Sequence, residues 1–251
     1  MLKKTVILLF ACWASLSVSA QTVEEIVAQA QQLEKQMKEG EALEKYREAL
    51  QVSPGHVQAF TQASLLAGRE GARHKDKAAK QEYFNNAKIY AYEALKVAPE
   101  NAEANYAMAV ALARIGQISG AKEKVAAAKE VKKYADLALK FKPEYGEAWH
   151  LIGKWNFDLY NYGTIEKAAA KVLFGGVPPG TMEDAIAAYE KCLKLKPSFI
   201  QNYYDLALAY RQNNQETQGM EVLNKGMRMR PIYQDDPGYK ADMKKMLEAM
   251  Q

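Results

Sequence analysis

The chain has 251 residues, of which 49% are hydrophobic and 25% are charged, and this globular composition argues against an intrinsically disordered chain. The formal net charge of +4 falls to +2, with 32 basic against 30 acidic residues, once Lys3 and Lys4 are left out as part of a segment that we expect to be removed. Nucleic-acid binding needs a concentrated basic face, so this near-neutral balance argues against a nucleic-acid partner.

The first 20 residues have the pattern of a secretory signal peptide. Lys3 and Lys4 precede a short apolar run over residues 5–13, and small residues at 18–20 precede a cleavage site before Gln21. We therefore expect an exported protein, periplasmic or associated with the cell envelope, whose single repeat domain spans residues 21–251.

Two alternatives for the N-terminus stay open. An uncleaved membrane anchor is one, although the apolar run is shorter than the roughly 20 residues that span a bilayer. A lipoprotein is the other, because Leu9-Phe10-Ala11-Cys12 resembles a degenerate lipoprotein signal. Membrane association is expected only if the N-terminus is retained or lipidated. The oligomeric state stays open.

A short phrase that ends in proline recurs along the rest of the chain, as in Ala94-Leu95-Lys96-Val97-Ala98-Pro99. Its copies end at Pro54, Pro99, Pro143, Pro197 and, in a weaker form, Pro231. Each copy is typical of the end of an amphipathic helix, because proline cannot continue a helix. The recurrence predicts an array of helical repeats.

Small residues lie at constant distances from these prolines. Ser64, Ala109, Gly153 and Ala207 lie ten residues after a proline, and Ala42, Ala87 and Ala185 lie twelve before one. Two helices that cross at close range need small side chains at the crossing point, so these positions predict the contacts within helix pairs. Tyr46 and Tyr189, eight residues before their prolines, are predicted to fill the space between pairs.

This pattern resembles the tetratricopeptide repeat, whose unit has 34 residues. The interval from Pro197 to Pro231 is 34 residues, whereas the other three are 45, 44 and 54, so inserts of about 10, 10 and 20 residues are expected. The resemblance implies an all-α fold, a right-handed superhelical stack of about ten helices without a sheet. Residues 232–238 are predicted to form a loop and residues 240–250 a C-terminal capping helix.

The longest insert, at about residues 160–182, carries a more specific pattern. The run His150-Leu151-Ile152-Gly153-Lys154-Trp155 is followed by a Lys- and Ala-rich helix over 165–174, a Gly- and Pro-rich loop over 175–181, and another helix from Glu183. Over about residues 130–235 this order resembles the regulator of microtubule dynamics family. The resemblance implies a binding protein of this fold. We do not carry over the microtubule role, because export would separate the chain from tubulin by a membrane.

The chain lacks the residue patterns of catalytic and metal sites. His56, His74 and His150 fall in separate repeats without another His or Cys at ligand spacing. Gly175-Gly176 lacks the Lys-Ser/Thr of a phosphate-binding loop and is predicted to end a helix. Cys192, the one cysteine after residue 20, is expected to be a buried apolar residue. We predict a protein that is not an enzyme and has no cofactor and no metal.

In such a stack the first helix of each pair lines the concave side. The repeat positions that face this groove are occupied by Tyr106, Arg114, His150, Lys154, Phe157, Tyr204, Leu208 and Arg211. Aromatic rings with isolated charges suit a helical or extended peptide whose acidic group is held by Arg or Lys. His150 is expected to be a polar contact on this groove, and Trp149 is assigned to the core by its repeat position.

These observations predict an exported interaction scaffold that holds a peptide or a partner protein in its concave groove. The alternative is an envelope protein that binds a small ligand or a lipid in an apolar pocket between helices near Trp155 and Phe174. A deep, closed cavity would favour the alternative, and an open groove would favour the scaffold. The loop at 175–181 is a second candidate for the interaction surface.

Overall fold

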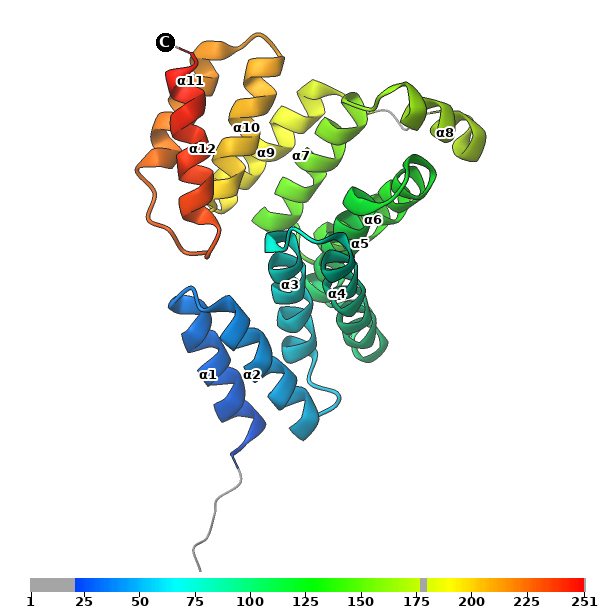
Figure 1. Cartoon of the computed structure of the whole chain (residues 1–251), viewed down its shortest axis with the longest axis vertical. Helices are drawn as coiled ribbons and strands as arrows, with labels where there is room; N and C mark the ends of the chain where they lie inside the picture. Colours follow the sequence, from blue (N-terminus) through cyan, green and yellow to red (C-terminus); the bar gives the residue numbers. More distant parts are fainter. Residues whose placement is uncertain (1–20, 177–179, 251) are drawn as a thin grey trace, which may run out of the picture.

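The computed structural model describes residues 21–176 and 180–250, which form twelve helices and no strand (Figure 1). The helices are α1 (Val23–Lys35), α2 (Glu39–Val52), α3 (Val57–Arg73), α4 (Lys77–Val97), α5 (Ala102–Ile118), α6 (Ala121–Phe141), α7 (Gly146–Tyr160), α8 (Thr164–Phe174), α9 (Met182–Leu195), α10 (Ile200–Gln212), α11 (Glu216–Met227) and α12 (Asp236–Glu248). The predicted signal peptide at residues 1–20 and the middle of the 175–181 loop lie outside the described residues.

Five helix pairs form the stack, namely α1–α2, α3–α4, α5–α6, α7–α9 and α10–α11. They account for the predicted ten helices and confirm the right-handed superhelix of tetratricopeptide type; α8 and α12 are additional. The capping helix α12 packs on α10 and α11 as expected. It begins at Asp236, inside the segment predicted to be a loop, because Pro237 lies in the first turn, where its missing N–H and restricted φ fit a helix.

The recurring prolines end the second helix of a pair in the same way each time. Ser53, Ala98, Lys142 and Lys196 each precede a proline and adopt φ between −133° and −145° with ψ between 72° and 89°. The ring of a proline excludes the helical conformation from the residue before it, so each helix stops there. The weaker copy at Pro231 differs, because α11 already ends at Met227.

The predicted small residues lie where the helices of a pair approach most closely. Ala42, Ala87, Ala109, Ala185 and Ala207 are fully buried, and Ser64 donates a hydrogen bond from its hydroxyl to the Ala87 carbonyl oxygen at 2.8 Å. A Cβ atom at Gly153 would lie 2.6 Å from Cδ1 of Tyr189. Glycine is therefore required at this crossing, since the Tyr189 ring occupies the space of any side chain.

The inserts are helical rather than looped. The second helices α4 and α6 have 21 residues each, whereas α2 and α9 have 14, so the first two inserts mainly lengthen helices. The third insert forms α8, which packs on α6 beyond the regular stack (Figure 1). Gly175 ends α8 with φ +76°, as predicted, and the Thr181 hydroxyl accepts from the Asp184 N–H at 3.0 Å at the start of α9.

We predict that Gly153→Ala destabilises the protein by about 1–3 kcal/mol, because the added methyl group overlaps the Tyr189 ring. In an unobstructed helix the same change stabilises by up to about 1 kcal/mol. The matched control is Gly68→Ala in α3, where the nearest atom to the new Cβ would be Cγ of Arg114 at 4.0 Å. Urea unfolding of both variants checks this, and shifts of the same sign would contradict it.

Candidate functional site

Side chains of α2 and α3 contact the segment that leads into α12, so the two ends of the stack meet across the concave side. This contact closes the concave side into a ring. Glu39, at the start of α2, is 2% exposed and accepts hydrogen bonds from Arg73 and, at 3.0 Å, from Nε of Arg69. Arg73 also donates to Asp235 Oδ1 at 2.7 Å. The Glu39 N–H donates to the Gln234 side-chain oxygen at 3.3 Å. We call these five residues the closing cluster.

Each charge of the closing cluster depends on its partners. Burial lowers the pKa of Arg73, but its hydrogen bonds to Asp235 and Glu39 raise that pKa to a net value above the ordinary one. The Arg69 guanidinium lies 5.1 Å from the centre of the Tyr233 ring, which extends the contact into the segment before α12. A buried carboxylate that loses its cation is costly, so this joint is strong only while it is complete.

The ring encloses a cavity of about 310 Å³, which we call the central cavity. Its wall combines tyrosines with an ion pair: Tyr106, Tyr145, Tyr233 and Tyr239 line it together with the pair of Glu147 and Lys196. Burial raises the pKa of both Tyr106 and Tyr145, so their hydroxyls stay protonated and can donate hydrogen bonds. Burial lowers the pKa of Lys196, but Glu147 and Tyr233 outweigh it and raise the net value, so Lys196 stays charged.

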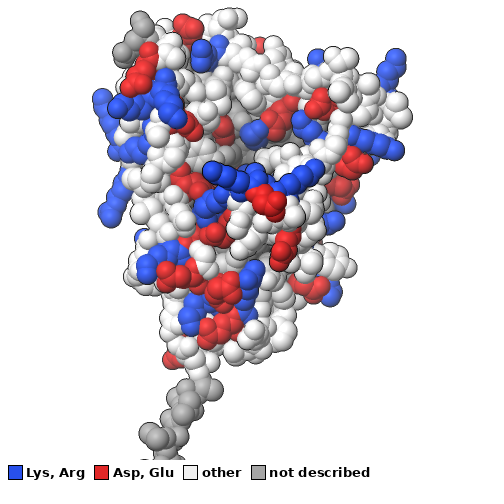
Figure 2. All heavy atoms as spheres, in the orientation of Figure 1, with Lys and Arg blue, Asp and Glu red and all other residues white. Residues whose placement is uncertain are grey.

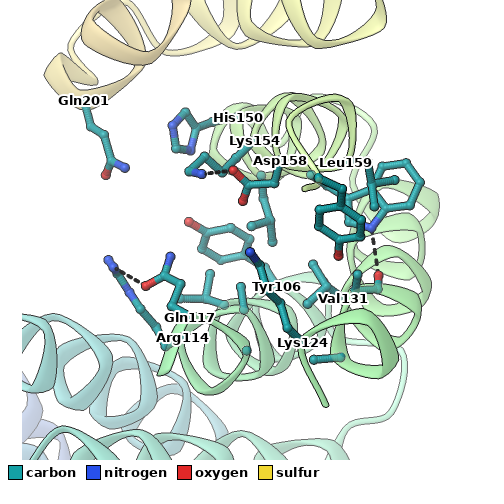
Figure 3. A pocket seen from close by; sticks show the side chains of 18 of the residues that line it. Tyr106, Arg114, Gln117, Lys124, Val131, His150, Lys154, Asp158, Leu159 and Gln201 are labelled. Carbon is teal, nitrogen blue, oxygen red and sulfur yellow. Dashed lines mark hydrogen bonds and ion pairs between the residues drawn. The ribbon is translucent and has the colours of Figure 1, made fainter. Parts of the chain in front are cut away.

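A second cavity of about 140 Å³, which we call the side pocket, lies between α5, α6 and α7 and reaches the N-terminal part of α10 (Figure 3). It shares Tyr106, Val110, Arg114, Phe199 and Gln201 with the central cavity, so the two adjoin. Its deeper wall is apolar and is formed by Val131, Leu151, Trp155 and Leu159. Pockets for drug-sized ligands measure about 300–1,000 Å³, so the side pocket suits a side chain or a chain terminus.

Four basic side chains line the side pocket, and three of them already have acidic partners. Lys124 pairs with Glu166 at 3.1 Å, Lys154 with Asp158, and His150 with Asp205 at 2.8 Å. The fourth, Arg114, donates only to the Gln117 side-chain oxygen at 3.4 Å and meets no carboxylate within the described part of the chain. Arg114 therefore offers a half-buried cation to an incoming anionic group, beside the Tyr106 hydroxyl.

His150 does not make the open groove contact that the sequence predicted. It is 6% exposed, its Nε2 lies 2.8 Å from Asp205 Oδ2, and its ring packs edge-on against Phe199 at 4.9 Å. It joins α7 to α10 instead. The prediction missed the partner because Asp205 lies 55 residues away and only the packing of successive pairs brings it close.

The other predicted groove residues divide into two groups. Arg114, Lys154 and Tyr106 line the side pocket together with His150. Phe157, Tyr204 and Leu208 pack against the C-terminal core instead, and Arg211 is exposed near the end of α10. The Tyr204 ring lies 5.9 Å from that of Tyr239, because α12 folds back over α10. A partner-binding role for these residues stays a prediction.

No group of three His, Cys, Asp or Glu within 21–176 and 180–250 could hold a metal ion. Burial raises the pKa of the Cys192 thiol, as expected for a buried apolar residue. In the same two ranges no helix is long and apolar enough to cross a membrane. On the face shown in Figure 2, basic and acidic side chains are interspersed.

Comparisons with known proteins agree with the fold. Residues 26–251 match the family described as Regulator of microtubule dynamics protein 1-3, well beyond the 130–235 segment in which the sequence pattern was apparent. The chain is 27% identical to regulator of microtubule dynamics protein 2 of Bos taurus over 168 residues, which cover 66% of this chain and 41% of that protein. It is 23% identical to protein 3 of Rattus norvegicus over 173 residues, covering 68% and 37%. The chain thus spans about two fifths of these relatives' length.

Among solved structures, a thermophilic TPR protein of Thermus thermophilus is similar in fold. The two structures have a TM-score of 0.63 at 12% identity, over 91% of this chain and 98% of the other. At this identity the likeness concerns the fold alone. It agrees with the tetratricopeptide pairs that the prolines and small residues predicted.

We predict that Arg73→Ala destabilises the protein by about 1–3 kcal/mol, because the buried Glu39 loses one of its two guanidinium donors. The ring should also open, which small-angle X-ray scattering would detect as a larger radius of gyration. The control is Lys38→Ala, which removes the exposed pair with Glu41 and should cost no more than about 1 kcal/mol. An unchanged radius of gyration for Arg73→Ala would show that other contacts hold α2 and α3 against the segment before α12.

Proposed function

Because the chain belongs to the regulator of microtubule dynamics protein 1-3 family, we propose that it works as a non-catalytic scaffold that binds a segment of a partner protein on its concave side. The tetratricopeptide fold supports a role in protein interaction. The described residues offer paired charges and aromatic surfaces there rather than a positioned nucleophile and base.

One observation carries the choice of site: Arg114 faces both cavities without a carboxylate partner among the described residues. A half-buried guanidinium favours an anionic ligand group, which it can hold through two parallel hydrogen bonds. We place an acidic side chain or the C-terminal carboxylate of the partner segment at Arg114, with Tyr106 as a further donor. The apolar wall of the side pocket would take the neighbouring apolar side chain of that segment.

The closed ring limits how much of a partner can enter. The central cavity of about 310 Å³ is lined by residues of α1 and α3 on one side and by the start of α12 on the other. A long helix therefore does not fit without opening of the closing cluster. A short extended segment or a chain terminus fits the present arrangement. A small ligand or lipid in these cavities is the competing function, and native mass spectrometry of the purified protein would reveal it as added mass.

We predict that Arg114→Leu weakens binding of a partner recovered from native extract by about 1 kcal/mol or more, since it removes the cation that no described carboxylate neutralises. Arg228→Leu is the matched control, because Arg228 is exposed, lines neither cavity and is not among the predicted groove residues. Surface plasmon resonance with the purified partner measures both, and unfolding curves confirm that both variants are folded. Full binding by Arg114→Leu, together with loss of binding after changes in the 175–181 loop, would move the site to that loop.

We also propose that the protein is exported to the periplasm or the cell envelope, on the strength of the pattern in residues 1–20. N-terminal sequencing of protein from its native cells is expected to start at Gln21. A lipidated Cys12 at the N-terminus would instead indicate a lipoprotein. An intact Met1 would indicate a retained segment, and the argument against a microtubule role would then lapse.

A further inference from the structure

A third hollow, which we call the outer cleft, lies between α6 and α9 with α7 as its floor. Its volume is about 870 Å³. It occupies the face of α7 that carries Trp149 and Ile152, opposite the face that carries His150 and Lys154 toward the side pocket. The outer cleft therefore opens on the other side of α7 from the side pocket, and Trp155 is the one described residue that lines both.

The second helices of neighbouring pairs do not pack on one another in the described part of this stack. Helix α6 packs on α5, α7 and α8, whereas α9 packs on α7 and α10. The pair α7–α9 therefore joins the preceding pair through α7. The second helices α6 and α9 are left apart, and the side chains between them face solvent.

Two tryptophans form the aromatic part of the outer cleft. The Trp149 indole N–H donates to the Pro143 carbonyl oxygen at 2.8 Å, and the Trp155 indole N–H donates to the Ala128 carbonyl oxygen at 2.7 Å. Both rings are only partly buried. Since their polar atoms are satisfied by the backbone, the rings are held in place and present an apolar surface. Trp149 also packs against the core of this part of the stack, as its repeat position predicted, while part of its ring is exposed.

Basic residues surround these rings. Lys129, Lys132, Lys133 and Lys191 line the outer cleft against two carboxylates, Asp136 and Asp184. Lys132 pairs with Asp136 at 2.7 Å and lies 5.6 Å from the Trp155 ring. Lys191 is exposed and forms no ion pair in the described ranges. The lining thus has four lysines and two carboxylates around an aromatic floor, and Lys133 also pairs with Glu130 at 3.3 Å outside the lining.

We propose that the outer cleft binds an acidic, partly apolar segment of a partner polypeptide. Its carboxylates would meet the lysines, and an apolar side chain would cover Trp149 or Trp155, the kind of anchor that dominates binding energy in protein interfaces. The hollow shape favours a peptide over a bilayer, whose surface is flat. This site extends the scaffold function to a second partner segment on the outer side.

The tryptophans make the proposal directly testable. The chain has three, and Trp149 and Trp155 are the two that follow residue 20. Because Trp155 also lines the side pocket, a background with Trp13→Phe and Trp155→Phe leaves all indole emission to Trp149, which lines the outer cleft and not the side pocket. The probe is a short synthetic peptide of glutamate and leucine, titrated into the full chain. We expect a saturable change in tryptophan emission that weakens as salt is added.

Charge reversal in α9 supplies the matched comparison. Lys191→Glu should weaken peptide binding by about fivefold or more, as expected for loss of an exposed ion pair. Lys194→Glu makes the same charge change three residues further along α9, at an exposed position outside the cleft, and should leave binding unchanged. Arg114→Leu should also leave it unchanged, which separates this site from the concave one.

Three results would overturn the proposal. One is an emission that does not respond to the peptide in the folded protein. Another is an equal loss of binding in Lys191→Glu and Lys194→Glu, which would indicate a diffuse charge effect. The third is a stronger, Lys191-dependent response to phosphatidylglycerol vesicles or to a single-stranded oligonucleotide than to the peptide. That response would assign the outer cleft to a membrane surface or to nucleic acid.

Discussion

The close approach of the two helices in each pair is the constraint on which the rest of the structure depends. At Gly153 the neighbouring helix comes so near that the Tyr189 ring occupies the place of a side chain, and the methyl groups of Ala42, Ala87 and Ala207 are fully buried. This spacing sets how each pair stacks on the next. The direction in which the side chains of α5, α7 and α10 point follows from it, and so does the position of every cavity.

Closure of the stack rests on a different kind of interaction. The helices of a pair are joined by apolar packing. By contrast, α2 and α3 are joined to the segment before α12 by the charged residues Glu39, Arg69, Arg73 and Asp235. Truncation of one apolar side chain removes only part of the packing energy. Removal of one member of a buried charge cluster costs more, because it leaves a buried charge without its partner. The concave side is therefore a ring of small cavities whose access depends on a few polar contacts.

The insert at α8 gives the third repeat two distinct faces. On the inner side, Glu166 of α8 pairs with Lys124 in the lining of the side pocket. Arg114 is then the lining cation that has no acidic partner in the described ranges. On the outer side, Trp149 and Trp155 lie among lysines between α6 and α9. Two hollows with different lining chemistry therefore open on opposite sides of α7.

The sequence by itself determined the repeat architecture, because its signals are local: a proline imposes an extended conformation on the residue before it, and a small residue marks a close crossing. The same reasoning found Tyr106, Arg114 and Lys154 in one pocket. Only the tertiary structure decided that His150 is bonded to Asp205, that Tyr204 is covered by α12, and that α3 contacts the segment before α12, since Arg73 and Asp235 are 162 residues apart. Such contacts depend on the summed rotation of five stacked pairs, which no local pattern specifies.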